Sequence, residues 1–422
     1  MVREGCVRQE GLKSPRAAGA GAAAGGGTVA PPAARLTGLD SSTAARRLHS
    51  FASDNYAGVH PAVLAALASA NGGHEVAYGE DSVTSVQLQR AVEEAFGAGA
   101  RAFPVFNGTG ANVIALQSLL RPWEGVICVD TAHIQCDEGG APEKVAGLKL
   151  HAVPHAGGKL TPAALASQLF DRDSVHRCQP GAVSITNTTE LGTVYSAAEV
   201  RALADAAHAA GLLLHMDGAR LANAAAALQL PFRAFTRDAG VDILSLGATK
   251  IGAMGAEAIV LLPQPGCAAQ AQRIAEALPF LRKSAMQLAS KQRFLSAQLC
   301  ALLEGGLAVQ LGAHANAMAA RLEAGLAGLA AQCNALALPM PCQANAVFPV
   351  LPEALVRALQ ARFKFYVWNA ADFAPRQQVR WMCSWDTSPE RVDELLAAVR
   401  EELGALGLLP TGEPGAPGVK GS

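Results

Sequence analysis

The chain has 422 residues, of which 50% are hydrophobic and 16% are charged, and its formal net charge is -1. This length is long for one hydrophobic core and fits a large domain with a smaller one. The nearly neutral charge provides no field that would draw the chain to nucleic acid or to an anionic membrane, so we expect neither as a partner. We find no apolar run long enough to cross a bilayer, which predicts a soluble protein.

The cysteines are scattered along the chain, and none of the nine forms a Cys-x-x-Cys pair. In a chain of this size such a pattern predicts neither a metal site nor a disulfide framework. A reducing compartment, the cytoplasm, is therefore the expected location.

Both ends of the chain differ from the rest in composition. Residues 1–48 are rich in Arg, Ala, Gly and Pro, and residues 408–422 are rich in Pro and Gly. Such segments cannot bury enough apolar surface to fold, so we expect both to be disordered. Arginines outnumber acids in residues 1–48, so an organelle transit peptide stays open, as does an incorrectly assigned start codon.

Between these ends, short apolar runs alternate with helical stretches. We expect strands at residues 102–106, 126–130, 148–153, 182–186 and 212–216, and in a run ending at 246, after which a second apolar run follows at 256–262. We expect helices at residues 85–97, 108–120 and 197–210. Strands that alternate with helices predict an α/β fold with a mostly parallel sheet covered on both faces.

Alanine-rich helices from residue 268 to about 329 connect this region to a last one. There we expect strands at residues 346–351, 365–368 and 379–383, followed by a helix at 389–403. The predicted organisation is a large domain of residues 49–335 and a small C-terminal α+β domain of residues 336–407.

The stretch Gly247-Ala-Thr-Lys250 closes one of the buried strands. Burial should lower the pKa of this lysine, and a neutral buried amine is the group that forms a Schiff base with a carbonyl cofactor. Gly252 and Gly255 would leave room for a bulky group beside it. The alternative is a lysine that extends from the strand end into water.

Polar residues also follow other strands, and ligands of open parallel sheets lie beyond the carboxyl ends of strands. Asn107-Gly-Thr-Gly110 opens a helix and could bind a phosphate with its free amides, or could be an ordinary glycine turn. Asp217 closes an apolar strand and needs a cationic partner, either a protonated pyridine nitrogen or Arg220. His133 could stack on an aromatic cofactor or transfer protons, or could be structural.

Taken together, the ordered motifs resemble those of the L-threonine aldolase family, most closely its bacterial low-specificity and phenylserine aldolase branch. The resemblance covers about residues 51–403 and is carried by Ser53-Asp-Asn-Tyr-Ala-Gly58, Ala77-Tyr-Gly79, Phe106-Asn-Gly-Thr-Gly110, Thr131-Ala-His133 with Asp137-Glu138, His215-Met-Asp-Gly-Ala-Arg220, Gly247-Ala-Thr-Lys250 and Arg380-Trp-Met-Cys-Ser-Trp-Asp386. The resemblance implies a fold type I, aspartate-aminotransferase-like enzyme that depends on pyridoxal 5'-phosphate (PLP). It implies a large domain with a mostly parallel seven-stranded sheet, and a homodimer or homotetramer with active sites built between subunits.

The resemblance also implies roles around the cofactor. Lys250 matches the lysine that binds PLP covalently, and Asp217 matches the carboxylate that keeps the pyridine nitrogen protonated. His133 matches the histidine that stacks on the ring. Four further positions match contacts to the cofactor phosphate or to its phenolic oxygen: Gly108, Thr109 and Thr249 for the phosphate, and Arg220 for the oxygen.

On the substrate side, Arg380 matches the arginine that binds the substrate carboxylate, and Ser53 matches a serine near the same group. His176 resembles a second histidine near the substrate hydroxyl, and the alternative is an exposed loop residue. Lys283 and Lys291 match lysines that reach the phosphate of the partner subunit, and a solvated helix face would explain them nearly as well.

The chain departs from the pattern beside the lysine. Close relatives usually have a second glycine where this chain has Ala248, and an asparagine where it has Ile251. These differences could change substrate range or rate, but neither removes a group that the reaction needs.

The expected activity is retro-aldol cleavage of L-threonine, L-allo-threonine and related β-hydroxy-α-amino acids such as phenylserine to glycine and an aldehyde. Positioned proton transfer in such a reaction commonly contributes about 10²–10⁴-fold. One alternative is a PLP-dependent β-eliminating lyase, which would use the same electron sink to expel a leaving group from Cβ. Another is a non-catalytic scaffold subunit, against which the presence of all the reactive groups argues. The sequence leaves the preferred aldehyde and the selectivity between the threonine isomers undetermined.

Overall fold

A computed structural model describes residues 49–409 of the chain. The disorder predicted for residues 1–48, and for residues 410–422 of the predicted tail 408–422, concerns segments outside the described residues. For the first two residues of that tail the prediction was wrong, because Leu408 and Leu409 pack against the hydrophobic core near the C-terminus.

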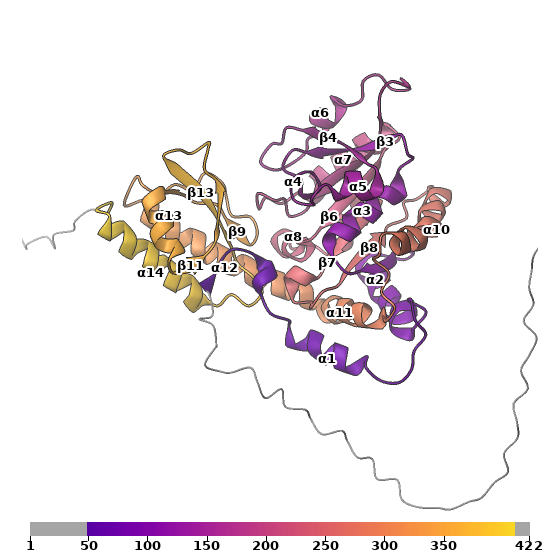
Figure 1. Ribbon diagram of the computed structural model, residues 1–422, viewed down its shortest axis with the longest axis horizontal. Coiled ribbons are helices and arrows are strands. Elements are labelled where there is room, and N and C mark those ends of the chain that lie inside the picture. The colour runs from indigo at the N-terminus through magenta and orange to yellow at the C-terminus, as the bar shows by residue number, and fades with distance from the viewer. Residues whose placement is uncertain (1–48, 410–422) are drawn as a thin grey trace, which may run out of the picture. The chain divides into compact units, whose positions relative to one another are not determined.

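The centre of the fold is a seven-stranded sheet with the strand order β2-β8-β7-β6-β5-β3-β4 (Figure 1). Its strands are β2 (Arg101–Val105), β3 (Glu124–Val129), β4 (Lys149–Val153), β5 (Gln179–Thr186), β6 (Leu213–Gly218), β7 (Ile243–Gly247) and β8 (Glu257–Leu261). Only β8 runs antiparallel to its neighbours in this sheet, because the connection from β7 is too short for a crossover helix. The mostly parallel α/β sheet is confirmed.

Side chains alternate between the two faces of this sheet. On β6, Leu213 packs in the core beneath α3 (Gly108–Leu119) and α10 (Ala268–Ser284). Leu214 and Met216 point to the opposite face, which is covered by helices that include α2 (Gln89–Phe96), α7 (Ala197–Ala209) and α9 (Phe232–Phe235). Because alternate residues of a strand share a face, Asp217 faces α3 together with Leu213.

The ends of several helices follow from local chemistry. Ser196 and Glu199 form a reciprocal capping box at the start of α7. The helix predicted at residues 85–97 begins as a π-helical segment, Val83–Leu88, and continues as α2. It ends at Gly97, whose φ of 101° is a conformation that glycine adopts easily.

The shorter helices of the larger region lie mostly in connections. They are α1 (Pro61–Ser69), α4 (His133–Cys136), α5 (Ala141–Ala146), α6 (Pro162–Ala166), α8 (Leu221–Leu228), and the 3₁₀ turns η2 (Asp54–Tyr56), η4 (Arg237–Ala239) and η5 (Thr249–Ile251). The expectation that no apolar run is long enough to cross a bilayer was wrong by length and composition, because among the described residues one stretch, Arg293–Ala330, passes that test. It is interrupted by η6 (Glu304–Gly306) between α11 (Arg293–Leu303) and α12 (Leu307–Ala330). Both helices pack against neighbours, α11 on α1 and α12 on α8 (Figure 1).

A second hydrophobic core lies near the C-terminus of the described chain, around the buried Trp381. It is built by α13 (Glu353–Gln360), α14 (Pro389–Ala405) and the strands β9 (Ala346–Val347), β10 (Val350–Pro352), β11 (Phe363–Lys364), β12 (Tyr366–Asn369) and β13 (Arg376–Met382). β1 (His49–Ser50) pairs with β11, and the second half of α12 also contributes to this core. The predicted division into residues 49–335 and 336–407 stays a prediction, because α12 takes part in both cores.

Candidate active site

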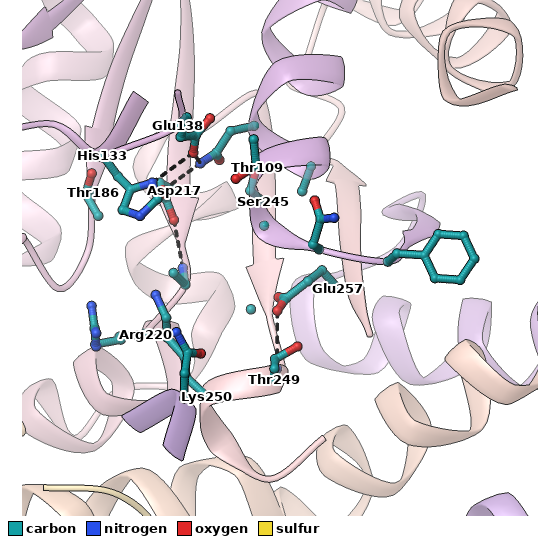
Figure 2. Close-up of a pocket in the computed structure, with 18 of the residues that line it drawn as sticks. Thr109, His133, Glu138, Thr186, Asp217, Arg220, Ser245, Thr249, Lys250 and Glu257 are labelled. Carbon is teal, nitrogen blue, oxygen red and sulfur yellow. Dashed lines mark hydrogen bonds and ion pairs between the residues drawn. The ribbon is translucent and has the colours of Figure 1, made fainter. Parts of the chain in front are cut away.

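A cavity of about 270 Å³ lies where the carboxyl ends of β5, β6 and β7 meet the amino end of α3 (Figure 2). Open parallel sheets bind ligands at this edge, and pockets for small ligands usually measure about 300–1,000 Å³. Seven of the twelve predicted site residues line the cavity: Gly108, Thr109, His133, Asp217, Arg220, Thr249 and Lys250.

Lys250 lies on η5, the single turn that follows β7. A buried carboxylate holds this turn, because Glu257 Oε2 accepts the Ala248 amide at 2.9 Å and Oε1 accepts the Thr249 amide at 3.3 Å. The lysine is thus fixed on a short turn between two adjacent strands, with its side chain at the cavity.

The charge balance around Lys250 favours its neutral form. The positive charge of Arg220 and then burial lower the pKa of Lys250, and the negative charge of Asp54 opposes them. A lowered pKa was expected from burial alone. The larger cause of the lowered pKa is the charge of Arg220, whose effect on the lysine the sequence analysis did not predict.

The two glycines that follow the lysine differ in what surrounds them. A Cβ added to Gly255, which lines the cavity, would meet nothing within 4 Å, as expected for a glycine that leaves room. At Gly252 the expectation was wrong, because a Cβ there would lie 2.9 Å from His60 Cβ. Gly252 is required by its φ of 108° and by this packing, not by space for a ligand.

The amino end of α3 presents amides toward the cavity. Asn107 caps the helix by accepting the Gly110 amide at 2.8 Å, and the first amides of the helix, at Gly108 and Thr109, have no partner within a helix. Gly110 has another function, since a Cβ at this position would lie 2.4 Å from Gln287 Cδ. The remaining amides and the Thr109 hydroxyl form a donor set suited to an anion such as a phosphate.

Asp217 does not pair with Arg220, which excludes the local ion pair considered from the sequence. Its Oδ1 accepts the Ala219 amide at 2.9 Å, and its Oδ2 accepts Asn112 Nδ2 at 2.8 Å. Arg220 instead binds Asp54 with two hydrogen bonds, of 2.6 and 2.9 Å. Asp217 is therefore a buried carboxylate that can bind a cation in the cavity.

His133 begins α4 and is held at two points. Its backbone amide donates to Glu190 Oε1 at 2.9 Å, and its ring Nδ1 lies 3.0 Å from Glu138 Oε1. The hydrogen bond to Glu138 raises the pKa of His133, while burial acts in the opposite direction. With Nδ1 bound to a carboxylate, Nε2 is the nitrogen left for a reactant.

Two of the three predicted substrate residues, Arg380 and Ser53, lie together, next to the cavity but outside its lining. Arg380 Nη2 donates to the carbonyl oxygen of Ala52 at 3.0 Å, which places the guanidinium beside the residue before Ser53. Burial lowers the pKa of Arg380 to about 10, and its guanidinium lies 4.5 Å from the centre of the Trp368 ring. Ser53 accepts the amide of Asn55, and Asn55 lines the cavity.

Three predicted residues are not brought to the cavity. His176 is exposed in the loop before β5, which is at the amino end of that strand, whereas the cavity lies at the carboxyl ends. Lys283, near the end of α10, is exposed, with its Nζ 5.1 Å from the centre of the Tyr78 ring. Lys291 is exposed between α10 and α11.

Several functional candidates were missed from the sequence. The chief ones are polar residues that contact predicted residues: the buried Asp54, Asn112 and Glu257, and the half-buried Glu190. Glu257 could have been found, since it is a lone carboxylate in the apolar run 256–262. The others carry no local signal, because their partners lie far away in the sequence.

The donor set fits PLP. One cavity contains an amine, a buried carboxylate without a cationic partner of its own, and a helix amino end with free amides. These groups complement the aldehyde, the pyridine nitrogen and the phosphate of PLP, respectively. Gly255 leaves the cavity open on the side of the lysine.

The chain is similar to known enzymes over most of its length. The model of the beta-eliminating lyase family matches residues 50–352. A low specificity L-threonine aldolase from a Pseudomonas species is 41% identical over 357 residues, which cover 84% of this chain and 98% of that protein. A protein of the same name from Pseudomonas aeruginosa shows the same identity and coverage.

The fold agrees with this relationship. The structure of Leishmania major threonine aldolase matches with a TM-score of 0.77 and 31% identity, covering 84% of this chain and 99% of that one. The family model and the Pseudomonas relatives each cover more than half of the chain. The chain therefore belongs to the beta-eliminating lyase family, within its low-specificity L-threonine aldolase group, and is a PLP-dependent lyase.

Proposed function

We propose that this protein cleaves L-threonine, L-allo-threonine and related β-hydroxy-α-amino acids such as phenylserine to glycine and an aldehyde. The observation that supports this most is the meeting of Lys250, Asp217 and His133 in one cavity of a chain 41% identical to low specificity L-threonine aldolases. The reaction is a retro-aldol cleavage of the Cα–Cβ bond.

Seven residues of the cavity hold the cofactor in this proposal. Lys250 provides the amine for covalent attachment, and the lowered pKa favours its reactive neutral form. Asp217 keeps the pyridine nitrogen protonated, and His133 lies against the ring. Gly108, Thr109 and Thr249 bind the phosphate, and Arg220 faces the phenolic oxygen. When bound, PLP supplies an electron sink for the pair that the breaking bond leaves at Cα.

His133 is the proposed base. Its Nε2 takes the proton of the substrate β-hydroxyl, the oxygen becomes the carbonyl of the leaving aldehyde, and the Cα–Cβ bond breaks. A proton then returns to Cα, and glycine leaves. His176 lies before β5, away from the cavity of its own chain, so it would act only from a neighbouring copy.

Arg380 and Ser53 bind the substrate carboxylate in this proposal. The guanidinium of Arg380 has no ion-pair partner among the described residues, and its planar fork suits a carboxylate. The hydrogen bond to the Ala52 carbonyl keeps it beside Ser53.

We also propose that the protein forms a homodimer or homotetramer. The exposed Lys283 and Lys291 would then be available to bind the phosphate in the cavity of a partner subunit. Light scattering on the purified protein tests the assembly, and a monomeric mass contradicts it. A cytoplasmic location is proposed as well, and imaging of tagged chains with and without residues 1–48 tests it against organelle targeting.

The activity is tested with the purified protein, PLP and L-threonine. We expect a visible absorption band of bound PLP and release of glycine and acetaldehyde in equal amounts. Lys250→Ala should lose at least the roughly 10²–10⁴-fold that positioned proton transfer contributes, while Lys149→Ala, at an exposed position at the start of β4, should change nothing. Ammonia and a 2-oxo acid as the products would support β-elimination instead, and a protein that takes up no PLP would refute the proposal.

A further inference from the structure

Four polar side chains form a continuous hydrogen-bonded chain from Asp217 to His133 through Asn112 and Glu138. Figure 2 labels His133, Glu138 and Asp217, which lie close together on one side of the cavity. Asn112 Nδ2 donates to Asp217 Oδ2 at 2.8 Å and to Glu138 Oε1 at 2.9 Å. The same Glu138 oxygen lies 3.0 Å from His133 Nδ1. Because an amide nitrogen has two hydrogens, one residue serves both carboxylates.

This arrangement determines the orientation of the Asn112 amide. If the amide were reversed, Asn112 Oδ1 would face two carboxylate oxygens, and three acceptors would be in contact without a donor. The orientation with Nδ2 between Asp217 and Glu138 is therefore the one that the two carboxylates select.

The chain of side chains is shielded from water. Asn112, Glu138 and Asp217 have exposed fractions of 2%, 7% and 5%. Asn112 Oδ1 and Glu138 Oε2 are buried without a hydrogen-bond partner among the described residues. In a buried network of this kind the charge on one member affects the next strongly.

The charges facing Glu138 come from three elements. Burial raises the pKa of Glu138, the hydrogen bonds from His133 (α4) and Asn112 (α3) lower it, and the negative charge of Asp217 (β6) raises it again. The groups that face the His133 ring are Glu138, Asp217 and Lys250. A cation bound by Asp217 would weaken the repulsion between the two carboxylates and so favour the ionised form of Glu138.

We propose that Asn112 and Glu138 are positioning residues that couple the ring-nitrogen end of the cofactor site to the proposed base. Glu138 fixes the His133 imidazole with Nδ1 as the donor, so that Nε2 faces the reactant. Asn112 donates to both Glu138 and Asp217. A protonated ring nitrogen of the cofactor, bound by Asp217, would therefore strengthen the hydrogen bond between Glu138 and His133. This inference rests on the proposed function, since it assigns His133 the role of base.

The test compares Glu138→Gln and Asn112→Ala with the wild-type holoenzyme and with Glu143→Gln. Glu143 is exposed on α5, so its substitution is the same chemical change outside the network. The measurements are the pH profile of kcat/KM for threonine, the pH titration of the visible band of bound PLP, and the retention of PLP on dilution.

Loss of the Glu138 carboxylate should lower the pKa of His133, so the acid limb of the kcat/KM profile should move to lower pH in Glu138→Gln. Its kcat should fall at least about tenfold, a part of the roughly 10²–10⁴-fold that positioned proton transfer contributes. Asn112 donates to Asp217 and Glu138 and not to His133, yet Asn112→Ala should shift the same limb. It should also weaken PLP retention roughly tenfold or more, because Asp217 loses a charge-assisted hydrogen bond.

The outcomes separate the inference from the activity on which it rests. If the wild type cleaves threonine and Glu138→Gln has the pH profile and spectrum of Glu143→Gln, the coupling is wrong and the activity stands. If neither the wild type nor any variant cleaves threonine, the proposed activity fails. The spectral titration and PLP retention still decide whether Asn112 and Glu138 influence the ring-nitrogen end of the cofactor site. If Asn112→Ala does not fold, Glu138→Gln, which keeps the size of the side chain, decides alone.

Discussion

At the scale of single residues, the cavity depends on a buried ion pair between distant parts of the chain. Arg220 and Asp54 are 166 residues apart and are joined by two hydrogen bonds. Burial opposes ionisation of Asp54, but the charges of Arg220 and Lys250 and the hydrogen bonds from Arg220 and Asn345 outweigh it and lower the pKa of Asp54. The pair places a compensated positive charge beside Lys250.

We expect Asp54→Asn to lower the free energy of unfolding by about 3–5 kcal/mol at neutral pH, because Arg220 is left buried without its anion. The pKa of Asp54 is lowered in the folded state, so its contribution is present above the unfolded pKa and is lost as pH falls through the folded pKa. The difference from the wild type in urea unfolding should therefore shrink in acid. Asp393→Asn, which breaks an exposed pair with Arg321, should change stability little, and an equal loss in both variants would contradict this account.

At the scale of elements, two helices cross at a distance that only glycine permits. A Cβ on Gly312 of α12 would lie 2.7 Å from the carbonyl carbon and oxygen of Ala222 on α8. The obstacle is backbone, which cannot turn away as a flexible side chain can. α8 follows Arg220 directly, so this crossing supports the position of that arginine.

Gly312→Ala should therefore destabilise the protein by about 1–3 kcal/mol, as overpacking of a core does. Gly328→Ala is the matched control in the same helix, since a Cβ there meets nothing within 4 Å. The control should be neutral or up to about 1 kcal/mol more stable, because alanine is the better helix former. Chemical unfolding measures the stability of both variants. Equal changes in stability would show that the close approach of α12 and α8 does not require glycine at position 312.

Another element contact predicts a pH dependence. His208, in the last turn of α7, lies with its Nε2 2.8 Å from Oδ2 of Asp242, just before β7. The hydrogen bond that His208 donates to Asp242 raises the pKa of His208 in the folded state, against the effect of burial. The stability contributed by the pair should be fully present below the unfolded pKa of about 6.5 and lost as pH rises through the folded pKa.

We expect His208→Gln to have a lower Tm than the wild type in mild acid, and the two values to converge at alkaline pH. His74→Gln, at an exposed position, should follow the wild type throughout. A Tm difference for His208→Gln that is independent of pH would mean that packing, and not the charge of the imidazole, is responsible.

At the scale of the whole described chain, its first and last parts complete the surroundings of the cavity. The Phe51 amide donates to the carbonyl of Lys364, and the Met382 amide donates to the carbonyl of Phe51. The beginning of the described chain is thus bound to the C-terminal strands. As a result, Arg380 on β13 lies next to Ala52 and Ser53.

Arg380→Lys should raise the KM for threonine by roughly tenfold or more, with a smaller effect on kcat, because an ammonium cannot bind a carboxylate with two parallel hydrogen bonds. Arg376→Lys, on the same strand, is the control and should leave KM unchanged. Steady-state kinetics with threonine measure both, and a KM unchanged in Arg380→Lys would remove Arg380 from the carboxylate site.

The sequence by itself determined the order of the main strands and longer helices along the chain, the mostly parallel sheet, and seven of the residues that line the cavity. It could do so because apolar runs, glycines and polar residues at strand ends are local signals, as at Asp217 and Lys250. It predicted that Gly252 leaves room for a ligand, whereas this glycine is required by its backbone conformation and by packing against His60. It also left open whether Arg220 pairs with Asp217.

Only the tertiary structure decided which polar groups meet. Asp54 reaches Arg220, and Asn112 bridges Asp217 and Glu138, because strands and helices far apart in sequence bring these side chains within hydrogen-bond distance. It also separated His176 from the cavity, since the loop before β5 lies at the opposite end of that strand. A side chain's partner depends on packing between elements, and no local pattern of residues specifies it.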